Sequence, residues 1–338
     1  MTSARKQLAL GVDIGGTKVA AGLLDSEGNI LFKARVPMKT SGTASEAMDC
    51  VHHAIREVLS NDAATGVSAI GIASPGPLEL PAGVVLKTPN IPCWHNFPLG
   101  DAVKRTYGLP TRVDNDANAA GLAEAVWGAG RGHQYVFYVT IGTGIGTAIV
   151  SDGQIFYGRT GVAPEGGHMT IDVHGERLCG CGKRGCLESL ASGPAIARRA
   201  REVLPTAAKT SELHRLCGGD PERLTTELVA QAWRAGDRLA TEILRGNADL
   251  LAVWLGNIID LLEPDVIVVG GGVGKVISEW FDYIRKQLPS CSINSRCLEI
   301  PLVLAKYGSD AGIAGAAALC FSAPAQIRVT PTLSVPAS

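Results

Sequence analysis

The sequence lacks any long apolar run. Its apolar segments, such as Tyr135–Val139 and Val266–Val269, are far shorter than the ~18 residues that a membrane-spanning helix needs. The residues that precede the first apolar segment, Met1–Gln7, are few and polar, unlike a secretory leader. These absences predict a cytoplasmic protein with no membrane partner.

An excess of charge of one sign is also missing. Lys and Arg number 31 and Asp and Glu number 32, which gives a formal net charge of −1. Without a basic surplus the chain has no general attraction for nucleic acid, so none is expected as a partner. The sequence contains neither G-x-x-x-x-G-K-[ST] nor a G-x-G-x-x-G with an acidic residue at the proper distance, which disfavours P-loop enzymes and dinucleotide dehydrogenases.

Glycine, by contrast, is abundant, with 41 residues that cluster after predicted strands. A strand at Leu8–Asp13 enters Gly15-Gly16-Thr17-Lys18, and a strand at Tyr135–Thr140 enters Gly142-Thr143-Gly144-Ile145-Gly146. Two further strand-like segments, separated by an Asp/Gly turn, follow each glycine loop, and the second set ends with a strand expected at Gln154–Tyr157. This repeat predicts an α/β protein with mixed sheets and an internal duplication.

Helical patterns follow each group of strands. Apolar residues at three- and four-residue spacings predict long helices within Leu187–Leu204 and Pro221–Leu262, and Gly315–Phe321 reads as the end of a last helix.

A chain of 338 residues is too long for one core, so we expect two domains. The predicted small domain covers residues 1–118, with a C-terminal helix at 310–322 packing back on it, and the large domain covers 119–309. The Pro-, Thr- and Ser-rich segment 323–338 is expected to be a loose tail.

Glycine loops at strand ends suit phosphate, because backbone N–H groups can approach an anion where no Cβ intervenes. In the first loop, Thr17 and Lys18 add a hydroxyl and a cation, and Asp13 suits a magnesium ion held through water. A third cluster, Gly270-Gly271-Gly272, follows another strand and would pass close to adenine or phosphate. A plain hairpin turn is the alternative for any single loop. The residues expected to bind the nucleotide are Asp13, Gly15, Gly16, Thr17, Lys18, Gly142, Thr143, Gly144, Gly146, Gly271 and Gly272.

A candidate catalytic carboxylate lies in Val113-Asp114-Asn115-Asp116. A strand ends near Val113 and a helix begins near Ala117, so Asp116 is expected near a helix N-terminus. Asp116 could take the proton of an attacking hydroxyl, and Asn115 offers a donor and an acceptor to a sugar. Asp and Asn before an Ala-rich helix are equally ordinary N-caps, and the segment alone does not decide between the two roles.

Three of the nine cysteines, Cys179, Cys181 and Cys186, lie within eight residues, and His168 precedes them. Three thiolates and an imidazole make a closed tetrahedral zinc site of the structural kind; unrelated thiols, or one disulfide and a spare, are the alternatives. Glu165 and Glu188 flank the cluster. A metal that gathered these segments would present two carboxylates and an imidazole to the hydroxyls of a sugar, whereas Glu188 could instead be a solvent-facing helix start.

Together these motifs resemble the ROK family (repressors, open reading frames, kinases) of the actin/hexokinase-type ATPase superfamily. The matching segments run in family order along nearly the whole chain: Asp13–Lys18, Ser74–Pro77, Thr88–Asn90, Asn115–Asn118, Gly142–Gly146, Glu165–His168, Cys179–Glu188, Gly270–Gly272 and Asp310–Gly312.

The resemblance implies a two-lobed actin-like (ribonuclease H-like) α/β fold and an ATP-dependent sugar kinase, with glucose as the expected acceptor. It implies Asp116 as the catalytic base and a usual homodimer or homotetramer. The implied zinc ligands are His168, Cys179, Cys181 and Cys186. The implied sugar site consists of Ser74, Gly76, Asn90, Asn115, Asp116, Glu165, His168 and Glu188.

Several alternatives stay open within that resemblance. The acceptor could be N-acetylmannosamine, N-acetylglucosamine, fructose or mannose; the donor could be polyphosphate; and a non-catalytic sugar sensor is the alternative of a different class. Members that repress transcription carry an N-terminal helix-turn-helix domain, for which a first phosphate loop at residue 13 leaves no room. Many members have a bulkier residue at the position of Gly166, which leaves open the shape of the pocket near the sugar C1–C2 side.

Overall fold

The computed structural model describes residues 7–323, so the predicted loose tail lies outside the described residues except for Ala323. Their contacts divide these residues into two compact units. The first unit comprises 7–134, 148–164 and 310–323, and the second comprises 135–147 and 165–309. The domain boundary expected after residue 118 stays a prediction. Within the described range, no helix combines the length and apolar character that crossing a membrane requires.

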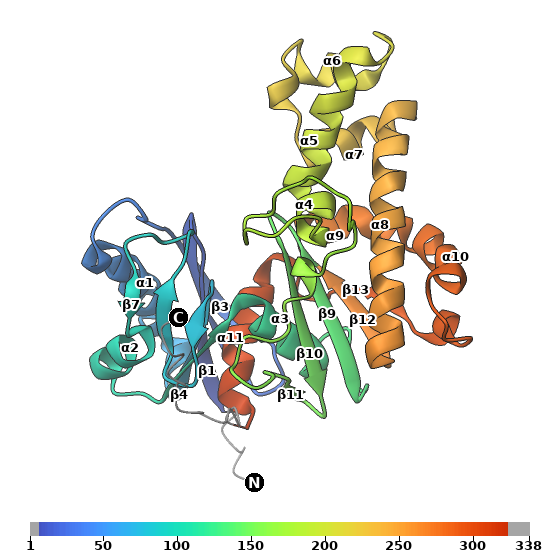
Figure 1. Ribbon diagram of the computed structural model, residues 1–338. Helices are drawn as coiled ribbons and strands as arrows, with labels where there is room; N and C mark the ends of the chain where they lie inside the picture. Colours follow the sequence, from blue (N-terminus) through green and yellow to red (C-terminus); the bar gives the residue numbers. More distant parts are fainter. Residues whose placement is uncertain (1–6, 324–338) are drawn as a thin grey trace, which may run out of the picture. The chain divides into compact units, whose positions relative to one another are not determined.

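The first unit is built on a five-stranded sheet with the order β3-β2-β1-β4-β8 (Figure 1). Its first three strands are successive antiparallel neighbours, whereas β1, β4 and β8 run parallel. The strands are β1 (Leu8–Ile14), β2 (Lys18–Asp25), β3 (Ile30–Pro37), β4 (Val67–Ser74) and β8 (Thr111–Asn115).

A second five-stranded sheet has the order β11-β10-β9-β12-β13, which repeats the first order element for element. Across this sheet too, an antiparallel pair, β11 and β10, lies at one side, and the parallel strands β9, β12 and β13 follow. The predicted mixed α/β class and internal duplication are confirmed. The strands are β9 (Tyr135–Ile141), β10 (Ile145–Ser151), β11 (Gln154–Ile155), β12 (Val266–Gly270) and β13 (Leu302–Leu304).

A small antiparallel sheet and eleven α-helices complete the described part of the chain. The small sheet consists of β5 (Leu78–Glu79), β6 (Val84–Lys87) and β7 (His95–Phe97). The helices are α1 (Ala44–Leu59), α2 (Leu99–Tyr107), α3 (Asp116–Val126), α4 (Leu187–Ala191), α5 (Gly193–Val203), α6 (Glu212–Cys217), α7 (Thr226–Arg234), α8 (Arg238–Leu262), α9 (Gly272–Ile277), α10 (Phe281–Cys291) and α11 (Ala311–Phe321).

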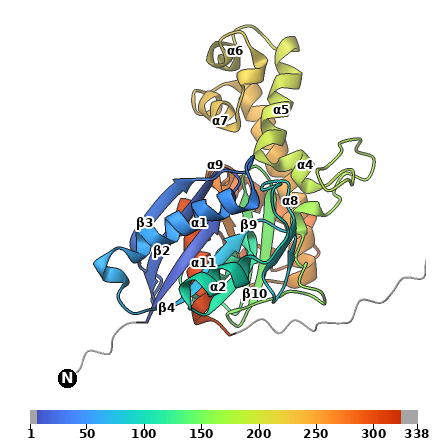
Figure 2. The ribbon, with the colours of Figure 1, turned by 90° about the vertical axis from the view of Figure 1, so that its left-hand side faces the viewer.

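Helices α1 and α11 cover opposite faces of the first sheet (Figures 1 and 2). Alternate residues of β1, such as Leu10 and Val12, join a buried core with Val51 and Ile55 of α1. Because side chains alternate along a strand, the residue between them, Gly11, faces α11. This sheet therefore has one face packed through large side chains and one face packed through glycines.

The glycine face lets α11 approach the strands at backbone distance. A Cβ added at Gly11 would lie 2.1 Å from the carbonyl oxygen of Ile313, and one added at Gly71 would lie 1.7 Å from that of Ala316. No shift of a flexible side chain relieves such a contact, because the neighbouring atom is backbone.

We therefore expect Gly71→Ala to destabilise the protein by about 1–3 kcal/mol, the usual cost of overpacking a core. The midpoint of urea unfolding measures this. Gly246→Ala is the matched control, because Gly246 lies inside α8 with only Arg199 Nη1, at 4.0 Å, near its added Cβ. It should be neutral or stabilise by up to ~1 kcal/mol. Equal midpoints for both variants would contradict the close packing of α11.

The two long predicted helices are each interrupted. Ser192 ends α4 and is also the N-cap of α5, whose second residue is Pro194; a proline is tolerated only in the first turn of a helix. Likewise the helix predicted at 221–262 is interrupted between α7 and α8 by Gly236, which has φ +85°. Asp237 is the N-cap of α8, and its carboxylate accepts from the Ala240 N–H. The predicted strand at 154–157 is also shorter, and ends at Ile155.

Candidate active site

Three parallel strands of the first unit bring polar residues to one edge of its sheet. Asp13 of β1 pairs with Ala73 of β4, which pairs with Asp114 of β8. One residue further on, Ser74 pairs with Asn115. Open α/β sheets bind ligands beyond the carboxyl ends of their strands, so this edge is where a ligand is expected.

The junction between β8 and α3 separates the two roles that the sequence left open. Asn115 is the N-cap of α3: its Oδ1 accepts from the N–H of Ala117 at 2.9 Å and of Asn118 at 3.3 Å. Asp116 is the first residue of the helix and is exposed. Although its surface reaches solvent, the protein around the carboxylate raises its pKa above the ordinary value of 3.8, mainly by desolvation.

Asp13 lies close enough to Asp116 for their charges to interact. Burial raises the pKa of Asp13 to about 6, and the carboxylate of Asp116 is the second cause of the rise. The start of α11 closes in from the other side, because a Cβ on Gly312 would lie 2.3 Å from Cγ of Asp13. Two carboxylates therefore share this sheet edge.

The first glycine loop is the turn between β1 and β2. The N–H of Gly15 donates to the carbonyl of Lys18 at 2.9 Å, which closes the hairpin. Thr17 and Lys18 form its exposed tip. A Cβ on Gly16 would lie 3.0 Å from the carbonyl oxygen of Asn90, so the loop lies directly against the segment that carries this predicted sugar ligand.

The other predicted sugar ligands of the first unit lie beside the N-cap of α3. A Cβ on Gly76 would be 3.5 Å from Nδ2 of Asn115. Ser74 is fully buried, and its hydroxyl donates to the carbonyl of Pro75 at 3.4 Å. In this unit, Ser74 is therefore a wall of the site rather than an exposed ligand.

The second glycine loop, in the second unit, is tied to a carboxylate. The Gly142 N–H donates to the Gly144 carbonyl, and the Gly142 carbonyl accepts from the Gly193 N–H, both at 2.9 Å. Oε2 of Glu188 accepts from the N–H of Ile145, also at 2.9 Å. A Cβ on Gly144 would lie 2.6 Å from that oxygen, so only glycine lets the carboxylate reach the loop. Glu188 thus supports the loop and is not a solvent-facing helix start.

The third glycine cluster packs against the strand that leads into the second loop. Gly271 has φ +85°, and its Cβ would lie 2.2 Å from the carbonyl oxygen of Ile141. Helix α9 begins at Gly272. Thr143 at the tip of the second loop is exposed, and Gly146 is half-buried.

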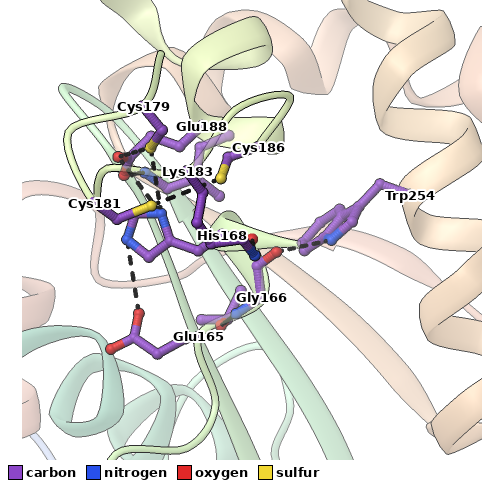
Figure 3. A network of polar contacts seen from close by, with 11 residues as sticks. Glu165, Gly166, His168, Cys179, Cys181, Lys183, Cys186, Glu188 and Trp254 are labelled. Carbon is purple, nitrogen blue, oxygen red and sulfur yellow. Dashed lines mark hydrogen bonds and ion pairs between the residues drawn. The ribbon is translucent and has the colours of Figure 1, made fainter. Parts of the chain in front are cut away.

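His168, Cys179, Cys181 and Cys186 converge on one point of the second unit (Figure 3). Their ligand atoms all lie within 4.8 Å of one another. The Sγ atoms of Cys181 and Cys186 are 3.7 Å apart, and Sγ of Cys179 is 3.5 Å from Nδ1 of His168. A tetrahedral zinc ion with bonds of ~2.3 Å to sulfur and ~2.0 Å to nitrogen would separate two sulfurs by roughly 3.8 Å, and a sulfur and a nitrogen by roughly 3.5 Å. The donor set therefore fits this metal.

The imidazole of His168 stands between the two predicted carboxylates (Figure 3). Its Nδ1 lies 3.9 Å from Oε1 of Glu188 and faces the thiols, whereas its Nε2 lies 3.9 Å from Oε2 of Glu165. The ring orientation, which the sequence left open, thus turns Nδ1 toward the thiols and Nε2 toward the more exposed Glu165.

Trp254 of α8, which the sequence does not single out, contacts the segment that carries Glu165. Its Nε1 donates to the carbonyl of Gly166 at 3.1 Å, and a Cβ on Gly166 would lie 3.3 Å from its ring (Figure 3). The Gly166 N–H in turn donates to Oγ1 of Thr147 at 2.9 Å. The indole thus packs against the space that a bulkier residue 166 would need, and holds the backbone beside Glu165.

Tyr157 is the second residue that the sequence did not single out. Its hydroxyl donates to Oδ2 of Asp114 at 2.5 Å, and both residues line a cavity of about 480 Å³ in the first unit. No sequence pattern indicates this contact, because it joins β8 to a segment 43 residues away. The predicted site residues thus form one group in each unit, and the cavity borders the first group.

The sequence model of the ROK family matches residues 9–323. The chain belongs to the ROK family. As a ROK protein it is 35% identical over 310 residues to a glucokinase of Thermotoga maritima, covering 92% of this chain and 96% of that one. It is also 35% identical to a glucokinase of Streptomyces coelicolor over 314 residues, covering 92% and 97% of the two chains.

Among solved structures, this ROK chain is similar to a ROK family glucokinase from Streptomyces griseus in complex with glucose and AMPPNP. The identity is 37%, the TM-score is 0.79, and the match covers 92% of this chain and 98% of the other. The actin-like α/β fold expected from the family resemblance is therefore confirmed.

Proposed function

We propose that this protein is an ATP-dependent sugar kinase that transfers the γ-phosphoryl group to glucose, at the 6-hydroxyl. The glucokinases that match it over more than nine-tenths of both chains support this function. The observation that carries the chemistry is an exposed carboxylate, Asp116, at the same sheet edge as Asp13 and the first glycine hairpin.

Asp116 serves as the general base. Its neighbour Asn115 performs the capping, which leaves the Asp116 carboxylate exposed for a substrate hydroxyl. As the sugar oxygen attacks phosphorus, Asp116 takes its proton; such proton transfer contributes about 10²–10⁴-fold to rate.

The nucleotide is held by glycine turns. The first hairpin, with Thr17 and Lys18 at its tip, and the Gly142–Gly146 loop bind phosphates, and Gly271 and Gly272 lie near the adenosine. Asp13 suits a magnesium ion through water, since a strand-end carboxylate is a hard oxygen ligand. When bound, that ion would neutralise charge on the phosphates.

The acceptor sugar is recognised by side chains that can donate and accept. Asn90 and Asn115 supply amides, Glu165 and Glu188 supply carboxylates, and the loop of Ser74 and Gly76 forms a wall. His168 donates from Nε2, because its Nδ1 faces the thiols. These groups match the vicinal hydroxyls of a hexose.

His168, Cys179, Cys181 and Cys186 would hold a structural zinc ion. Four protein ligands leave no open position for chemistry, so the ion's contribution is to order residues 165–188. We also propose that the protein works in the cytoplasm, and that it forms a homodimer or homotetramer, as the ROK resemblance implies.

A panel of sugars assayed against two phosphoryl donors tests the function. With ATP, we expect the highest kcat/KM for glucose and weaker turnover of mannose, fructose, N-acetylglucosamine and N-acetylmannosamine; with polyphosphate we expect little turnover. A higher kcat/KM for an N-acetyl sugar would replace glucose as the acceptor. Sugar binding without turnover of any member would instead make the protein a sugar sensor.

A further inference from the structure

We propose that Tyr157 is a positioning residue for the catalytic base, acting through Asp114; this inference rests on the proposed sugar kinase activity. Tyr157 follows β11 in the chain, whereas Asp114 and Asp116 lie at the junction of β8 and α3. All three residues belong to the first unit.

Asp114 is a buried carboxylate whose surface is only 3% exposed, and it is two residues away from the base. Its Oδ1 accepts from the backbone N–H of Asn115 at 2.7 Å and from Nδ2 of Asn118 at 3.2 Å. One donor, Asn115, directly precedes Asp116 in the chain, and the other, Asn118, follows it by two residues. The carboxylate of Asp114 thus holds the backbone N–H just before Asp116 and the side chain of Asn118 just after it.

The second oxygen of Asp114 is satisfied by the phenol of Tyr157, with a 2.5 Å separation between hydroxyl and Oδ2. A hydrogen bond to a buried charge is among the stronger ones, and the charge becomes costly if its donor is removed. Among the described residues, Tyr157 is the donor to Oδ2, whereas the two donors to Oδ1 both lie within residues 115–118. It therefore fixes the orientation of the Asp114 carboxylate plane.

The hydrogen bond from Tyr157 affects the protonation of Asp114 near neutral pH. Burial raises the pKa of Asp114 to about 6, and the hydrogen bonds from Tyr157, Asn118 and the Asn115 backbone oppose that rise. Burial and the charge of Asp114 raise the pKa of the Tyr157 hydroxyl. Arg112, the charged group nearby, opposes that rise. Without the phenol, Asp114 would take up a proton at higher pH and weaken its hold on the α3 start.

The test compares Tyr157→Phe with a matched control, Tyr107→Phe. Tyr107 is likewise half-buried with a bonded hydroxyl, 3.1 Å from Nδ1 of His52, but it lies at the end of α2 outside the β8–α3 junction. We expect Tyr157→Phe to lower kcat for glucose about tenfold, because small misplacements of a catalytic group are costly. The KM values for glucose and ATP should stay within about twofold, and Tyr107→Phe should leave kcat unchanged.

Two further readouts separate positioning from mere stability. In Tyr157→Phe, kcat should fall on the acid side at a higher pH than in the wild type, because Asp114 protonates earlier. Asp114→Asn should lower kcat by a similar factor, because an amide nitrogen in place of Oδ2 cannot accept from the Tyr157 hydroxyl. The double variant should be no worse than the more impaired single variant, since both substitutions remove this same hydrogen bond.

A Tyr157→Phe enzyme with wild-type kcat and pH profile, or one whose loss the Tyr107→Phe control reproduces, would overturn the inference while leaving the kinase assignment intact. Additive losses in the double variant would overturn it as well. A wild-type protein that phosphorylates no sugar would overturn both, so the two failures are distinguishable.

Discussion

Asp116→Asn should lower kcat for glucose phosphorylation by about 10²–10⁴-fold, the contribution of a general base. The amide keeps the size of the side chain but cannot accept the hydroxyl proton. Since Asn115 supplies the cap of α3 and Asp116 is exposed, the midpoint of thermal unfolding should change little. Steady-state kinetics with a coupled assay for ADP, together with glucose binding by calorimetry, measures the effect.

Asp101→Asn is the control for Asp116→Asn. Asp101 is also an exposed aspartate in the first turn of a helix, α2, and should show wild-type kinetics when replaced. If only the loss of a negative charge near a helix N-terminus mattered, kcat would fall by a similar small factor in both variants. Turnover within about threefold of wild type in Asp116→Asn would be incompatible with a role in proton transfer.

Protein purified without chelators should contain one zinc ion per chain, and the Cys181→Ser variant should contain much less zinc. The proposed metal holds the segments that carry Glu165 and Glu188, so its loss should raise the KM for glucose by about 10–100-fold, the range found when metal sites are weakened. The KM for ATP should change less, because the first glycine hairpin contains none of the metal ligands. Elemental analysis and kinetics measure these effects.

Cys291→Ser provides the control, because Cys291 is a half-buried free thiol at the end of α10, outside the metal cluster. It should retain zinc and glucose affinity. Wild-type protein without zinc that nevertheless binds glucose normally would refute a structural role for the metal. Removal of the metal by a chelator should reproduce the kinetics of Cys181→Ser.

Features encoded by local chemistry could be predicted from the sequence. The two hairpins that open the duplicated sheets were predictable because glycine and Asp/Gly turns punctuate the strands, whereas the positions of the later parallel strands were not predicted. The convergence of one histidine and three cysteines was predictable because their spacing within residues 168–186 is local. The helix start at Asp116 was predictable from Asn115, although which residue would cap it was not.

Contacts between distant segments could not be predicted in this way. Nothing near Tyr157 in sequence indicates that its hydroxyl reaches Asp114, and nothing near Trp254 indicates that it packs on Gly166. The interruption at Ser192 was hidden by apolar periodicity that continues across Pro194, although a proline in the first turn of α5 is a local start signal. Single-chain patterns record local preference, whereas these contacts depend on the tertiary fold.

The glycine-lined face of the first sheet has a consequence for how the protein is made. Strands β1, β2 and β4 are complete once residue 74 has left the ribosome, but the helix that covers their glycine face begins at residue 311. Until α11 emerges, this surface has no permanent cover, so the first part of the chain to be synthesised is among the last to reach its final packing. We expect nascent chains that stop before residue 311 to depend on chaperones.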